Sequence, residues 1–70
     1  MKFKKWVVKF NEVHLPIGDL ARDIMNDDAF PESNDYDAML DYLENIHASD
    51  QAIQTFENAF AYFKLELGPQ

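Results

Sequence analysis

The most informative stretch of the sequence is residues 49–67, which read SDQAIQTFENAFAYFKLEL. Apolar side chains recur in it every three or four residues, the spacing that places them on one face of an α-helix. Ser49 or Asp50 is expected to cap this helix at its start, and Gly68 and Pro69 are expected to stop it. The predicted buried stripe comprises Ala52, Ile53, Phe56, Ala59, Phe60, Phe63 and Leu67.

The N-terminal residues predict another amphipathic helix, of about two turns. Apolar side chains at positions i, i+3, i+4 and i+7 form its stripe: Phe3, Trp6, Val7 and Phe10. The neighbouring lysines fall off this stripe. A short strand through Val7 and Val8 is the competing interpretation, since β-branched residues favour strands, and we prefer the helix.

Two further helices are predicted between these ends. Pro16 suits the first turn of a helix. The buried face of that helix comprises Ile17, Leu20, Ala21, Ile24 and Met25. Residues 27–34 hold a proline, acids and small polar residues, so we expect a loop that Phe30 pins to the core. Asn34 or Asp35 then caps the next helix. Its buried face comprises Tyr36, Met39, Leu40, Leu43 and Ile46.

These four blocks predict a single all-α domain over residues 1–70, a compact bundle of four short helices. A chain of this length buries only a modest share of its surface, and small domains usually need disulfides, a metal or an unusually rich core. The sequence has no cysteine, but ten of its residues are aromatic. We therefore expect an aromatic core to take the place of covalent cross-links.

Charge is unevenly distributed along the chain, whose net charge is −7. The first ten residues contain no acid and four lysines: Lys2, Lys4, Lys5 and Lys9. The remaining residues carry all 13 acids against only Arg22 and Lys64. An acidic body repels nucleic-acid phosphates and attracts basic partners, so general nucleic-acid binding is disfavoured.

The sequence contains no segment that predicts a membrane location. No apolar run approaches the roughly 20 residues that span a bilayer, and no continuous apolar segment of a signal peptide follows the lysine-rich start. The lack of cysteine fits a reducing compartment. We therefore expect a cytoplasmic protein that neither crosses nor enters a membrane by itself.

Five short sequence blocks are spread over nearly the whole chain, from residue 3 to residue 63. They are Phe3-Lys-Lys-Trp6-Val-Val-Lys9-Phe10, Leu20-Ala21-x-x-Ile24, Asp27-x-x-Phe30-Pro31, Asp35-Tyr36 to Tyr42-Leu43-Glu44, and Thr55-Phe56-x-x-Ala59-Phe60-x-x-Phe63. In this order they resemble the YozE-like family of small, mostly uncharacterised bacterial proteins. The resemblance implies a sterile-alpha-motif-like bundle and no assigned biochemical activity. Since sterile-alpha-motif-like domains often self-associate, the oligomeric state stays open.

The sequence offers no complete catalytic or metal-binding constellation. Glu44-x-x-His47 has the helical spacing of a di-iron ligand pair, but such a site needs two pairs and two further glutamates. The aspartates within residues 27–41 lack the spacing, the glycine and the closing glutamate of an EF-hand loop. There is no cysteine nucleophile and no glycine-rich phosphate loop. We expect a non-enzymatic protein with no cofactor and no metal.

We interpret the chain as an interaction module that binds a protein partner through an acidic surface. The expected surface residues are Asp28, Glu32, Asp37 and Asp41. The alternative is a nucleic-acid-binding accessory protein, in which the four N-terminal lysines contact phosphates and an exposed Phe3 or Trp6 stacks on a base. Helical spacing instead brings those aromatics together and inward. A third interpretation is an acidic surface that imitates phosphates and occupies a nucleic-acid-binding protein.

Overall fold

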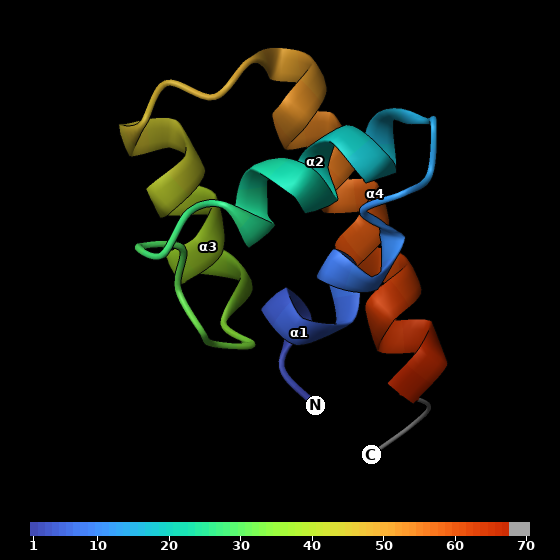
Figure 1. Cartoon of the computed structure of the whole chain (residues 1–70). Helices are drawn as coiled ribbons and strands as arrows, with labels where there is room; N and C mark the ends of the chain where they lie inside the picture. The colour runs from blue at the N-terminus through green and yellow to red at the C-terminus, as the bar shows by residue number, and fades with distance from the viewer. Residues whose placement is uncertain (68–70) are drawn as a thin grey trace.

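The computed structural model describes residues 1–67, which contain four α-helices and one short 3₁₀ helix joined by short connections (Figure 1). They are α1 (Phe3–Val7), the 3₁₀ helix η1 (Val8–Phe10), α2 (Pro16–Met25), α3 (Tyr36–Asn45) and α4 (Asp50–Leu67). The longest helix is α4, and α1, α2 and α3 each pack against it. The predicted all-α bundle is confirmed, and residues 1–67 contain no strand.

An aromatic cluster fills the centre of the bundle, where α1, α3 and α4 meet. The Phe3 ring is fully buried, with its centroid 5.5 Å from those of Phe56 and Phe63 and 5.6 Å from that of Phe60. The rings of Phe56 and Phe63 meet the Phe3 ring edge-to-face, a geometry that aromatic pairs prefer, and the Phe60 ring is tilted against it. The predicted core is confirmed at most positions. Its buried members are Phe3, Trp6, Val7, Leu20, Ala21, Ile24, Phe30, Met39, Leu43, Phe56, Ala59, Phe60 and Phe63.

Two residues that the sequence predicted to be buried are exposed. Met25 is 45% exposed and Ile46 is 51% exposed. Met25 is the last residue of α2, one position beyond the buried Ile24, and Ile46 follows the last residue of α3. The helical period no longer fixes which way a side chain points where the helix ends. The structure does not describe the side chain of Leu67, so its predicted burial is not tested, and the predicted stop at Gly68 and Pro69 lies outside the described residues.

Side-chain caps begin the last two α-helices. Asp35 Oδ1 accepts hydrogen bonds from the backbone N–H groups of Asp37 (3.0 Å) and Ala38 (3.4 Å). Ser49 Oγ accepts one from the N–H of Ala52 at 3.1 Å. Of the two predicted caps for α3, Asp35 is therefore the correct one. The predicted entry of α2 at its proline is also confirmed.

The loop between α2 and α3 is anchored at three points. Phe30 is buried, as predicted, and its ring packs edge-on against Tyr42 at a centroid distance of 5.6 Å. Asn34 Oδ1 accepts a hydrogen bond from the N–H of Phe3 at 2.8 Å. Lys4 Nζ donates to a backbone carbonyl at the loop's start, at 3.2 Å. The loop is thereby tied to the first helix, far away in sequence.

α3 ends in a Schellman motif, the turn that commonly closes helices with a left-handed residue. The N–H of Ala48 donates to Leu43 O at 2.9 Å, and the N–H of His47 donates to Glu44 O at 3.1 Å. His47 has φ 60°, a left-handed backbone conformation in which glycine is the usual residue. A side chain at this position therefore strains the backbone.

His47→Gly is expected to stabilise the fold by about 1 kcal/mol, because a left-handed conformation costs L-residues roughly that amount. Urea denaturation followed by circular dichroism measures this change. His14→Gly is the matched control, because His14 is exposed and has no positive φ. The control should be neutral or mildly destabilising, since glycine adds entropy to the unfolded chain. A His47→Gly protein no more stable than the wild type would contradict this interpretation.

Candidate protein-binding surfaces

The four predicted acidic site residues are all exposed, and they lie in the α2–α3 loop and on α3. Asp28 follows α2, Glu32 lies in the loop, and Asp37 and Asp41 stand one turn apart on α3. Within residues 1–67, none of these four carboxylates accepts a hydrogen bond or forms an ion pair. We name this set the acidic surface. Its side chains are available to a partner.

Two neighbouring aspartates serve the fold instead. Asp27 accepts hydrogen bonds from the N–H of Ala29, at 3.0 Å, and from the hydroxyl of Tyr42. Asp35 caps α3. The acids of this region therefore divide into structural ones and free ones, and the predicted site contains only free ones.

Glu44 extends the acidic surface, and the sequence analysis missed it. It is exposed and lies three residues after Asp41 and seven after Asp37, a spacing that places the three on one face of α3. The pKa of Tyr36 is raised first by its hydrogen bond to Glu57, then by partial burial, and then by nearby charges that include Asp37 and Glu44. The helical spacing alone was enough to find Glu44.

The Tyr42 hydroxyl links α3 to the start of the loop that carries the acidic surface. Its hydrogen bond to Asp27 raises the pKa of Tyr42, and burial and the Asp27 charge raise it further. A pKa raised by folding means that the native state favours the protonated phenol. This contribution to stability is fully present below the unfolded pKa of about 10 and is lost as the pH rises through the higher folded pKa.

Tyr42→Phe is therefore expected to reduce the loss of stability between about pH 9 and pH 11. The measurement is urea denaturation at a series of alkaline pH values. Tyr62→Phe, which removes an exposed hydroxyl on α4, is the control and should keep the wild-type pH dependence. If Tyr42→Phe lost stability as steeply as the wild type, the Tyr42–Asp27 bond would not be responsible.

The basic N-terminal residues do not form the site that nucleic-acid binding by stacking requires. Lys2, Lys5 and Lys9 are exposed, but Lys4 is half-buried and donates to the Asp27 carbonyl. The aromatics between them, Phe3 and Trp6, are buried, so neither presents a ring to a base. Their interpretation as core residues is confirmed. Phosphate contact by the lysines stays a prediction.

A hollow of about 430 Å³ beside the C-terminal half of α4 was not predicted from the sequence. Its lining comes from α1, η1, α2 and α4: Trp6, Phe10, Ile17, Tyr62, Leu65 and Glu66. Tyr62 is 66% exposed and Leu65 is 77% exposed, so two large apolar side chains three residues apart on α4 face solvent. The sequence signal was present, because both residues fall off the buried stripe of α4.

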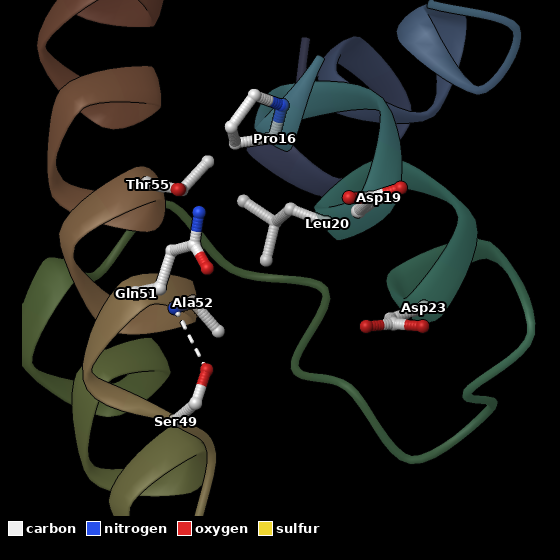
Figure 2. Close-up of a pocket in the computed structure, with 8 residues that line it drawn as sticks. All are labelled: Pro16, Asp19, Leu20, Asp23, Ser49, Gln51, Ala52 and Thr55. Atoms are coloured by element: carbon white, nitrogen blue, oxygen red, sulfur yellow. Dashed lines mark hydrogen bonds between the residues drawn. The ribbon is translucent and has the colours of Figure 1, made fainter. Parts of the chain in front are cut away.

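A second hollow, of about 170 Å³, lies between α2 and α4 and is more polar (Figure 2). Its lining residues are Pro16, Asp19, Leu20, Asp23, Ser49, Gln51, Ala52 and Thr55. Figure 2 shows Asp19 and Asp23 on the α2 side and Gln51 and Thr55 on the α4 side. Asp19 pairs with Arg22, whereas Asp23 has no ion-pair or hydrogen-bond partner among residues 1–67.

Only one member of the Glu44-x-x-His47 pair, Glu44, lies on a helix. α3 ends at Asn45, so His47 falls in the left-handed turn beyond it. Within residues 1–67, no three histidine, aspartate or glutamate side chains are grouped so that they could hold a metal ion. No helix in the same part of the chain is both long and apolar enough to span a bilayer.

The comparison with known proteins agrees with the fold. The family model for the YozE SAM-like fold matches residues 3–64. No curated protein and no solved structure is detectably similar to the chain. The matched span includes α1, α2, α3 and most of α4. The resemblance seen in the sequence is thereby confirmed, and the chain belongs to the YozE SAM-like fold family.

Proposed function

We propose that the chain is a non-enzymatic interaction module of the cytoplasm that binds a basic protein through its acidic surface. One observation carries the proposal: Asp28, Glu32, Asp37 and Asp41 are exposed and unengaged, while the adjacent Asp27 and Asp35 are used by the fold. Free carboxylates on a body of net charge −7 attract a basic partner at long range and raise its association rate.

The first step of the test is capture of partners from a native lysate on the immobilised protein, with and without nuclease, followed by mass spectrometry. A neutral variant carries Asp28→Asn, Glu32→Gln, Asp37→Asn and Asp41→Asn. We expect this neutral variant to lose the nuclease-resistant partners, because the charges that steer and hold them are gone.

A control of equal net charge separates the acidic surface from overall charge. It carries Glu12→Lys, Asp50→Asn and Gln54→Lys, all at exposed positions outside the acidic surface. The control should capture the same proteins as the wild type. Equal capture by the neutral variant would refute the placement of the site. If the captured proteins disappear after nuclease treatment, nucleic-acid binding through the N-terminal lysines is favoured instead. The affinity for nucleic acid should then fall steeply with salt concentration.

A further inference from the structure

We propose that the two hollows along α4 form one groove for an amphipathic, basic helix of a partner protein. The groove consists of the apolar hollow between η1 and the end of α4 and the polar hollow between α2 and the start of α4. It lies outside the acidic surface, so this inference goes beyond the proposed function and does not depend on it.

The spacing of the two hollows fits a helix. Thr55 in the polar hollow and Tyr62 in the apolar hollow are seven residues apart, so they share one face of α4 at a separation of about 10 Å. On the other wall, Pro16 and Ile17 are consecutive residues at the start of α2. A helix lying along α4 would place side chains seven positions apart in the two hollows.

The apolar hollow selects a large hydrophobic side chain. Tyr62 and Leu65 stand exposed on one side, and Phe10 and Ile17 are partly buried on the other. At its base, the indole N–H of Trp6 donates to Glu66 Oε2 at 2.7 Å. The indole N–H thus has its hydrogen-bond partner already, so the largely buried Trp6 leaves no unpaired donor at the hollow.

The charges of the groove select a basic partner. Every ionisable acidic or basic side chain that lines the two hollows is an acid: Asp19, Asp23 and Glu66. Asp19 and Glu66 are engaged by Arg22 and Trp6, which leaves Asp23 as the carboxylate for a lysine or arginine. A second copy of this chain is a poor occupant, because it brings a net charge of −7 to an acidic groove.

A hydrogen bond within the fold fixes the wall of the groove opposite α4. Arg22 Nη1 donates to the carbonyl of Asn11 at 2.7 Å and fixes the connection between η1 and α2. That connection joins Phe10 to Ile17, two residues that line the apolar hollow together with Tyr62. The groove is therefore pre-formed, and a partner helix need not order it on binding.

The test is selection of a display library of helix-forming peptides of about 14 residues, nearly four turns, on the immobilised full chain. We expect enriched peptides to carry a large apolar residue and, seven positions away, lysine or arginine. Leu65→Asp should weaken their binding at least about tenfold, and Asp23→Asn several-fold, whereas Asp41→Asn on the acidic surface should change it less than about twofold.

Leu65 is exposed, so Leu65→Asp should fold, and circular dichroism together with the milder Leu65→Ala checks this. Failure to enrich any peptide, or enriched peptides insensitive to both groove variants, would overturn the groove. So would sedimentation that shows self-association of the wild type abolished by Leu65→Asp, because the occupant would then be a second copy. None of these outcomes bears on the acidic surface, which is tested by its own neutral variant.

Discussion

Gly18→Ala is expected to destabilise the fold by about 3 kcal/mol, although alanine is the better helix former by about 1 kcal/mol. Gly18 lies in the first turn of α2, and a Cβ built on it would stand 1.7 Å from the carbonyl oxygen of Val13 and 2.7 Å from the carbonyl carbon. Both atoms belong to the backbone, so no side-chain rotation relieves the clash. The connection between η1 and α2 would have to move.

Chemical denaturation of the purified variant measures this loss. Asp23→Ala in the same helix is the control, because Asp23 is exposed, and its effect should stay within about 0.5 kcal/mol. A gain of stability in Gly18→Ala would mean that helix propensity decides at this position and that the approach of Val13 is not as close as the structure shows.

Phe3→Ala is expected to cost about 3–5 kcal/mol, the range for removing a buried aromatic ring. Phe3 joins α1 to α4 through three phenylalanines, and its ring also lies 5.9 Å from Trp6. A domain of this size rarely has more than about 3–5 kcal/mol of stability in its core, so the variant should be largely unfolded at room temperature.

Circular dichroism and the dispersion of amide signals in an NMR spectrum report this unfolding. Tyr62→Ala removes an aromatic ring that is largely exposed on α4, and it should remain folded. If Phe3→Ala kept a cooperative transition within about 1 kcal/mol of the wild type, the aromatic cluster would not be the main source of stability.

Periodicity and end signals predicted the bundle because they depend on neighbours in sequence. The stripe of α4, the entry of α2 at Pro16 and the Phe30 anchor each follow from spacing or from local backbone chemistry. These signals weaken where helices end. Met25 and Ile46 were misplaced for that reason, and the change from α1 to a 3₁₀ helix at Val8 was not foreseen.

Features made by contacts between distant segments could not be predicted from spacing. From the sequence alone, Gly18 is only a residue of low helix propensity. Nothing near it in the sequence shows that the Val13 carbonyl lies against it. The groove likewise depends on how α2 crosses α4, which patterning does not specify. The sequence pattern places Tyr62 and Leu65 off the buried stripe of α4, so their exposure could be predicted. The residues that line the hollow with them could not.

The candidate acidic surface was predictable in its members but not in its availability. The sequence does not show that Asp27 would bind Tyr42 or that Asp35, not Asn34, would cap α3. Only the fold separates these structural carboxylates from the free ones. Glu44 could have been found from helical spacing and belongs with Asp37 in any later variant of this surface.

The most direct test of the acidic surface is the affinity of a purified captured partner, measured by isothermal titration calorimetry against three proteins at one salt concentration. These are the wild type, the neutral variant and the control of equal net charge. We predict binding at least about tenfold weaker for the neutral variant and within about twofold of the wild type for the control. Equal affinities for the wild type and the neutral variant would contradict the proposal that this surface binds the partner.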